Sequence, residues 1–140
     1  MLEIFKTVNN ELVRTDVFEE GVWVNLVNPT EGEITDVSNK LNVEIDFLRA
    51  ALDEEERARI ESNNGQTLII VDIPVIEKDG DENIYTTIPL AIIVIKHIII
   101  TVCLKSDTLL NDFKNNNVKA FLTQFKTRFV LQILYKNAAK

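Results

Sequence analysis

The chain has 140 residues, which is about the size of one domain and too short for two cores of ordinary size. Because 46% of its residues are hydrophobic, it can offset the entropy lost on folding, and this excludes a wholly disordered chain. Its net charge of -7 excludes nucleic acid as a partner, since phosphates demand clustered Lys and Arg side chains, and makes metal cations more compatible partners.

The single cysteine and the N-terminal residues indicate a cytosolic protein. Cys103 allows no internal disulfide and lies in an apolar stretch, so we expect a buried, inert thiol. The N-terminus lacks the basic region and the long apolar core of a signal peptide. We therefore expect a soluble piece that resides in the cytosol.

The first quarter of the chain predicts three strands and the start of a helix. Residues 2–7 and 12–15 are expected to form a hairpin around Asn9-Asn10, and residues 22–27 a third strand with Trp23 on one face. Thr30 and Glu33 have the spacing of a capping box, in which two side chains satisfy free amides at the start of a helix.

Two helices are expected after this cap. Their apolar residues recur at spacings of three and four, which is typical of a buried helical stripe: Ile34, Val37 and Leu41 in the first, and Ile45, Leu48 and Leu52 in the second, at about residues 43–52. An acidic run at residues 53–56 ends this pair, and a fourth strand is predicted near Ile60.

An Ile/Val-rich tract from residue 67 to residue 104 dominates the middle of the chain. Its densest part contains Pro89 and a Lys96-His97 pair, whereas a membrane-spanning helix needs ~20 predominantly apolar residues. The tract therefore predicts strands at residues 67–77, 84–95 and 98–104. Continuous β-branched residues without alternation indicate strands that are covered on both faces, so helices must flank a central sheet.

The pattern returns to helix after Lys105. One helix is expected at about residues 107–113 and a longer one from Val118 onwards, past a linker at residues 115–117. The longer helix has one apolar face (Val118, Phe121, Leu122, Phe125, Phe129, Ile133), and Val130, Leu131 and Leu134 widen that face to most of the circumference. We therefore expect this helix to pack on more than one neighbour. The fold class is α/β (α+β), with about seven strands.

Catalytic constellations are not evident in this sequence, and we expect no enzyme. His97 is the only histidine, which excludes a multi-histidine zinc site, and at a strand junction it is expected to be a solvent-facing turn residue. A catalytic triad centred on it would need an exposed nucleophile, and Cys103 is expected in the core. The four glycines are scattered singly, whereas a phosphate-binding loop needs several close together.

Carboxylates remain as candidate ligands, because hard divalent cations prefer oxygen. Asp79-Gly80-Asp81 resembles the start of a calcium loop, but the glycine and glutamate that such a loop needs are replaced by Ile84 and Leu90. A solvated hairpin loop at residues 78–83 is the simpler interpretation. The acidic run at residues 53–56 is an alternative cluster, for which we expect a solvated helix end.

Several segments, in this order, resemble the cytoplasmic N-terminal domain of the CorA family of magnesium and cobalt transporters. They are WVNLVNPT at residues 23–30 followed by Glu33, LDEEERAR at 52–59, LIIV at 68–71, YTTIPL at 85–90 and IITV at 99–102. The resemblance implies a three-layer α/β/α sandwich around a mixed, about seven-stranded sheet. In that family a stalk helix, two membrane helices and a Gly-Met-Asn motif follow this domain. Here the only methionine is Met1, so we expect a single domain, residues 1–140, truncated before them.

The resemblance also implies a function. The chain would be the cytoplasmic regulatory, ion-sensing domain of an inner or plasma membrane protein, a CorA-like divalent-cation (Mg2+/Co2+) channel or transporter, and would meet the membrane only through the missing helices. Family cations bind between adjacent domains, which points to Glu77 and Asp79, with Asp81 as an alternative, as one half of a weak Mg2+ site. The full-length parent would be a homo-pentamer, and this piece a monomer or weak dimer. A stand-alone cytosolic interaction module without a transport role is the alternative.

Overall fold

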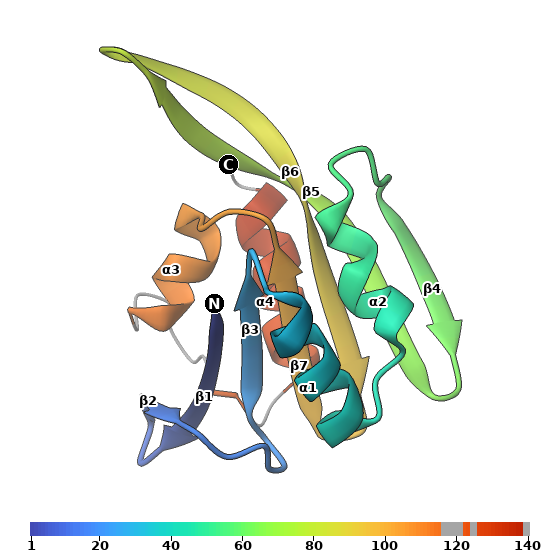
Figure 1. Ribbon diagram of the computed structural model, residues 1–140. Helices are drawn as coiled ribbons and strands as arrows, with labels where there is room; N and C mark the ends of the chain where they lie inside the picture. The colour runs from blue at the N-terminus through green and yellow to red at the C-terminus, as the bar shows by residue number, and fades with distance from the viewer. Residues whose placement is uncertain (116–121, 124–125, 139–140) are drawn as a thin grey trace.

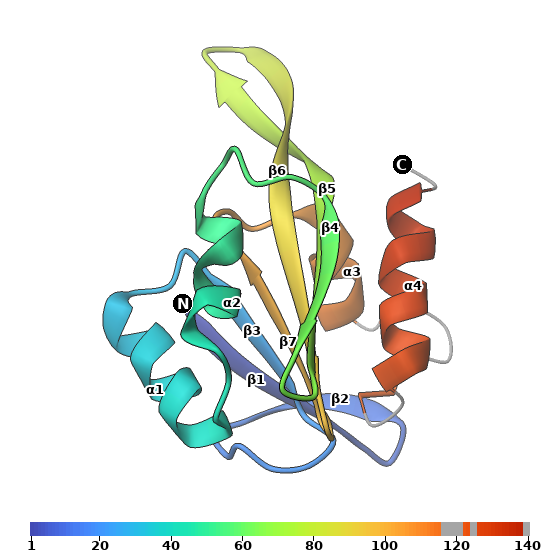
Figure 2. The same cartoon turned by 90° about the vertical axis from the view of Figure 1, so that its right-hand side faces the viewer.

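The computed structural model describes residues 1–115, 122–123 and 126–138, which form a mixed sheet between two helical layers (Figures 1 and 2). In these residues the sheet has seven strands in the order β2-β1-β3-β7-β6-β5-β4, and β3 pairs with β7 in parallel while the other neighbours are antiparallel. This architecture confirms the predicted α/β/α sandwich. The strands are β1 (Leu2–Val8), β2 (Glu11–Thr15), β3 (Trp23–Val27), β4 (Arg59–Asn63), β5 (Gln66–Asp79), β6 (Glu82–Ile95) and β7 (Ile98–Cys103).

Helices cover both faces of this sheet. One layer contains α1 (Glu31–Leu41), α2 (Ile45–Arg49) and the 3-10 turn η1 (Ala50–Leu52), and the other contains α3 (Thr108–Lys114) and α4 (Lys126–Ala138). The first layer buries residues such as Val24, Ile34 and Leu48. The second buries Trp23 against Phe129, with ring centroids 5.0 Å apart in an edge-on arrangement that aromatic pairs favour.

Local signals in the sequence explain the turns and the first helix. Asn9 and Asn10 both adopt positive φ, as the tight turn between β1 and β2 requires, and asparagine tolerates this conformation well. Thr30 and Glu33 form the predicted capping box: the Thr30 hydroxyl accepts from the Glu33 amide at 3.1 Å, and the Glu33 carboxylate accepts from the Thr30 amide at 3.0 Å.

The amino terminus strengthens the same helix start. The Met1 ammonium donates to the Val27 carbonyl at 2.6 Å and lies 3.1 Å from Glu33 Oε1. The backbone hydrogen bond from Thr30, together with this ammonium, lowers the pKa of Glu33 despite its partial burial. Glu33 therefore joins the first residue to the start of α1.

The C-terminal helix differs from its prediction. The expected start at Val118 lies outside the described residues, but Leu122 and Thr123 are described and are not helical, and the helix begins at Lys126. Thr123 instead exchanges two hydrogen bonds with Thr7 of β1, each from a backbone amide to a threonine hydroxyl, at 3.0 and 2.9 Å. This long-range pair, which helical periodicity does not reveal, explains the later start. Phe129 and Ile133 are buried as expected, and Phe129 contacts both Trp23 of β3 and Phe113 of α3, so the helix packs on more than one neighbour as predicted. Leu131, on the widened part of the apolar face, is 61% exposed.

The Ile/Val-rich tract forms the predicted strands, but the helical layers cover both faces of these strands for only part of their length. All six residues of β7 are buried, whereas residues 82–87 of β6 are exposed. The far ends of β5 and β6 extend beyond both helical layers (Figure 1). None of the helices in the described part of the chain combines the length and apolar character needed to cross a bilayer.

We predict that Thr30→Ala destabilises the protein by about 1 kcal/mol, because the amide of Glu33 loses its hydroxyl acceptor at the start of α1. Urea unfolding followed by Trp23 fluorescence measures the loss. Thr30→Ser is the matched control, because it keeps the hydroxyl and should remain within about 0.5 kcal/mol of the unmodified protein. Equal losses in both variants would show that the cap contributes nothing.

Candidate functional site

The ends of β5 and β6 form a two-stranded ribbon that projects from the body of the domain (Figures 1 and 2). β4 pairs with β5 only as far as Ile70, and β7 pairs with β6 only from Leu90 onwards. Beyond these points residues 72–79 and 82–89 pair with each other alone, and Gly80, with a φ of 65°, and Asp81 make the turn. The polar loop expected at residues 78–83 is therefore mostly strand, with a two-residue turn.

This ribbon brings two of the three predicted site residues, Glu77 and Asp79, onto one face. Side chains alternate along a strand, so Glu77 and Asp79 share the face of Ile73 and Val75, which are buried in the α3/α4 layer. The register also places Glu82 directly opposite Asp79. Sequence reasoning missed Glu82 because it treated residues 78–83 as a loop. A two-residue turn at Gly80-Asp81 would have indicated the pairing.

The carboxylates on this face are not equivalent. Asp79, Asp81 and Glu82 are exposed near the tip, and Asp81 lies in the turn itself rather than on either face. Glu77 is partly buried and forms an ion pair with Lys105, which lies in the loop between β7 and α3. The described residues contain no group of three or more His, Cys, Asp or Glu side chains arranged to hold a metal ion. The acidic face is at most part of a cation site.

The alternative acidic run at residues 53–56 forms a local turn. Asp53 Oδ1 accepts from the Glu55 amide at 3.0 Å, and the Asp53 carbonyl accepts from the Glu56 amide at 3.0 Å. Glu56 forms an ion pair with Arg59 of β4. Asp53, Glu54 and Glu55 are exposed, in agreement with the predicted solvated helix end.

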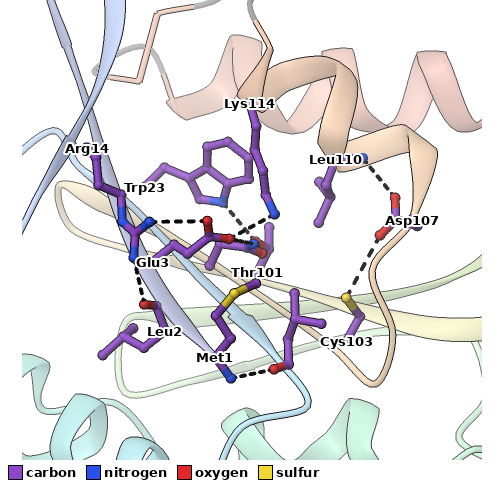
Figure 3. A network of polar contacts seen from close by, with 12 residues as sticks. Met1, Leu2, Glu3, Arg14, Trp23, Thr101, Cys103, Asp107, Leu110 and Lys114 are labelled. Atoms are coloured by element: carbon purple, nitrogen blue, oxygen red, sulfur yellow. Dashed lines mark hydrogen bonds and ion pairs between the residues drawn. The ribbon is translucent and has the colours of Figure 1, made fainter.

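A buried row of connected polar side chains crosses the sheet beneath α3 (Figure 3). Trp23 Nε1 donates to Thr101 Oγ1 at 2.8 Å, and Thr101 donates to Asn25 Oδ1 at 2.8 Å. Asn25 Nδ2 then donates to Glu3 Oε1 at 3.2 Å. The row therefore joins β7, β3 and β1.

Lys114, at the end of α3, completes the row with a positive charge. Its ammonium lies 2.8 Å from Glu3 Oε1, and both side chains are largely buried. Burial alone would raise the pKa of Glu3, but the hydrogen bond and charge of Lys114, aided by Asn25 and Arg14, lower the pKa overall. Because the chain supplies its own cation to this carboxylate, the row fits a structural role that fixes α3 on the sheet.

Cys103 and His97 occupy the places expected for residues without a chemical role. Cys103 is fully buried, and burial together with the negative charge of Asp107 raises the pKa of its thiol to about 12. The thiol donates to the Lys105 carbonyl, with 3.2 Å between Sγ and the oxygen. His97 lies in the tight turn between β6 and β7, exposed to solvent, with Nε2 3.7 Å from a Glu20 oxygen.

Comparisons with known proteins agree with this fold. A family model described as CorA-like Mg2+ transporter protein matches residues 18–139. The cobalt/magnesium transport protein CorA of Methanocaldococcus jannaschii is 28% identical over 81 residues, which are 58% of this chain and 24% of that protein. The solved structure of the complete CorA magnesium transporter from the same organism has a TM-score of 0.76 at 20% identity, over 98% of this chain and 44% of its own.

The soluble domain of the same transporter, solved separately, gives a similar result. Its TM-score is 0.77 at 21% identity, and the match covers 97% of this chain and 55% of that domain. The chain therefore spans less than two thirds of each of these relatives, and the likeness to the solved structures establishes the fold.

We predict that Glu3→Gln destabilises the protein at neutral pH and makes its acid unfolding shallower. The pKa of Glu3 is lowered in the folded protein, so its charge stabilises the fold at pH values above 4.5, the ordinary pKa of a free glutamate side chain. This contribution disappears as the pH falls through the lower pKa of the folded state. Urea unfolding at a series of pH values measures the effect. Glu11→Gln, on the exposed side of β2, is the matched control, and an equal change in both variants would argue against the buried pair.

Proposed function

The chain belongs to the CorA-like Mg2+ transporter family, whose model matches residues 18–139, and from this premise we propose that it is the cytoplasmic ion-sensing domain of a divalent-cation channel or transporter. Transport itself would belong to a longer protein. The matched segment makes up 24% of the cobalt/magnesium transport protein CorA, so that relative is about four times as long as the segment. The proposed role is regulatory, and it involves binding and packing rather than catalysis.

The observation that carries the proposal is the acidic face of the ribbon. Glu77, Asp79 and Glu82 lie on one side of a two-stranded projection that extends beyond the helical layers. Such a projection can present its carboxylates to a neighbouring subunit, where an oxygen-rich set would attract a hard cation. We propose that a divalent cation such as Mg2+ bridges this face to a neighbouring subunit.

The proposed mechanism is a change in packing that depends on this cation. Cations that bridge neighbouring subunits favour a closed, symmetric ring, because they bind that arrangement better than an open one. When the cation concentration falls, like charges near the tip repel one another and the ring loosens. The family resemblance implies that the ring is a pentamer in the longer protein.

Affinity in the isolated chain should be weak, for two reasons. Mg2+ gives up its water reluctantly, and one face of the ribbon supplies only a few oxygen ligands. In addition, the Lys105 ammonium already neutralises Glu77, so an incoming cation must compete with it. Both effects suit a sensor that responds to concentrations near the millimolar range.

A stand-alone interaction module is the second candidate, and exposed apolar residues on the same ribbon favour it. Ile76 is 55% exposed and Tyr85 is 72% exposed, which suits contact with another protein. This candidate requires self-association or partner binding that does not change with Mg2+, whereas the leading proposal requires cations to bind at the ribbon.

We predict that Mg2+ and Co2+ bind at the ribbon with a dissociation constant of roughly 1 mM, and that Glu77→Gln with Asp79→Asn abolishes this binding. Magnetic resonance spectra recorded during a Mg2+ titration locate the site, since signals of residues 77–82 should shift. Glu54→Gln with Glu55→Gln is the matched control and should leave the titration unchanged. Shifts confined to residues 53–56, or none at all, would rule out the ribbon as the site.

We also predict that Lys105→Met increases the affinity for Mg2+ up to about fivefold, because a half-exposed ion pair contributes at most about 1 kcal/mol. The same titration measures this change. Lys78→Met removes a ribbon ammonium from the opposite face and serves as the control. An unchanged affinity in Lys105→Met would show that the ion pair does not compete with the cation.

A further inference from the structure

The strand β4 is a sheet edge that no helix or strand in the described part of the chain covers. It stands last in the strand order and pairs with β5 alone (Figure 1). All five of its residues are exposed, so neither helical layer reaches it. β4 is therefore held to the domain mainly by its backbone pairing with β5.

Half of the backbone groups of β4 point away from the sheet. Asn63 and Gln66 flank the two-residue turn at residues 64–65, which makes them a hydrogen-bonded pair of the antiparallel ladder. Hydrogen-bonded and non-hydrogen-bonded pairs alternate from there, so the amides and carbonyls of Ser62 and Ile60 face outwards. The register with β5 is continuous and β4 contains neither proline nor lysine, so this edge can accept another strand.

A row of isoleucines ends at this edge. Ile92 of β6 lies opposite Ile69 of β5, and Ile69 lies opposite Ile60 of β4. Ile92 is fully buried, Ile69 is partly buried and Ile60 is 73% exposed. Because apolar cross-strand neighbours stabilise a sheet, a further strand with an apolar residue opposite Ile60 would continue the row.

The charges of β4 are complementary to those of a second, antiparallel β4. Arg59 and Glu61 lie on the face opposite to Ile60, because side chains alternate along a strand. When a two-fold axis passes through Ile60, the two Ile60 side chains lie opposite each other. Each Arg59 then lies opposite the Glu61 of the other copy. The outward-facing groups of the two Ile60 residues also meet and can exchange two hydrogen bonds.

The same charges disfavour the neighbouring registers. The axis must lie on a residue rather than between two, because otherwise outward-facing backbone groups would meet inward-facing ones. An axis at Arg59 would place two arginines directly opposite each other, and an axis at Glu61 would do the same with two glutamates. Like charges in these positions destabilise a strand pair, so the axis at Ile60 is favoured over both.

Arg59 and Glu61 are accessible to a second copy although each already has a contact within the chain. Arg59 contacts Glu56 through Nη1, its Nη2 lies 3.4 Å from Glu61 Oε2, and its side chain is 39% exposed. These two contacts use only some of the N–H donors of a guanidinium. Glu61 is 49% exposed, and a carboxylate accepts several hydrogen bonds. A pair with the second copy can therefore form beside the pairs within each chain.

We propose that β4 pairs antiparallel with β4 of a second copy across a two-fold axis at Ile60, so that two seven-stranded sheets become one continuous sheet. The contact uses the same surface on both copies and therefore closes at a dimer. Two five-residue strands form a small interface, so the dimer is weak, with a dissociation constant of roughly 0.1–1 mM.

This contact goes beyond the proposed function and does not depend on it. β4 contributes no residue to the acidic face of the ribbon, and no cation takes part in the contact. The dimer is therefore measured in EDTA. A failure of the Mg2+ titration leaves this measurement unaffected, and a failure of the dimer leaves the titration unaffected.

Sedimentation velocity of the full chain in EDTA, from about 10 µM to about 1 mM, tests the proposal. The β4 variants are Arg59→Glu and Glu61→Arg. Lys40→Glu and Asp36→Lys are the matched controls, because they reverse the charges of an exposed ion pair on α1 and change the net charge by the same amounts. Fluorescence of the buried Trp23 checks that each variant is folded.

The expected results follow from the pairing of charges. The unmodified chain and both controls should approach the mass of two copies and no more. Each β4 variant alone should associate about tenfold more weakly, because like charges then face each other in both charged pairs. An equimolar mixture of Arg59→Glu and Glu61→Arg should restore a dimer with one copy of each, because every charged pair again joins unlike charges.

Three outcomes would overturn the proposal. One is an unmodified chain that stays monomeric at the highest concentration, and another is a mass that grows beyond two copies. The third is an Arg59→Glu variant that associates as strongly as Lys40→Glu, because with the axis at Glu61 the side chain of Arg59 would lie opposite Asn63 and its charge would matter little.

Discussion

The fold depends on burial of both faces of β7. All six of its residues are buried, and its neighbours are β3, in parallel, and β6, in antiparallel orientation. A parallel pair needs a long connection, and here the chain between β3 and β7 supplies the α1/α2 layer and the strands β4 to β6. The α3/α4 layer follows directly and covers the other face. The order of the remaining elements therefore follows from the need to exclude water from both faces of β7.

The ribbon is the part of the sheet that extends beyond both helical layers. A two-stranded hairpin is marginally stable in water by itself, and the exposed Ile76 and Tyr85 gain little from burial within one chain. The ribbon is thus the part of the sheet whose local stability contact with a cation would change most. The proposed cation face lies on the ribbon, where this marginal stability leaves room for a ligand to act.

Patterns among residues close in sequence predicted much of the fold. Features that depend on contacts between residues far apart in sequence were not predicted. The turn at Asn9-Asn10 and the cap formed by Thr30 and Glu33 involve residues close in sequence, and their composition predicted them correctly. The interruption before α4 depends on a contact between Thr7 and Thr123, which no local pattern shows. The same limit applies to the candidate site. Glu77 and Asp79 were predicted from resemblance, whereas Glu82 emerged only from the register of β5 and β6.

The segment between β7 and the end of α3 connects the ribbon to the body of the domain. Its first lysine, Lys105, pairs with Glu77 on the ribbon, and its last, Lys114, pairs with Glu3 in the buried row. Lys114 is held by a largely buried carboxylate, whereas Lys105 and Glu77 are about half exposed, so the ribbon end of this segment is the easier one to release. Displacement of Lys105 by a cation would free the loop that precedes α3 while Lys114 keeps the helix on the sheet. A change at the ribbon would therefore reach the loop before α3 without disturbing the core, which is the arrangement that the proposed sensing role requires.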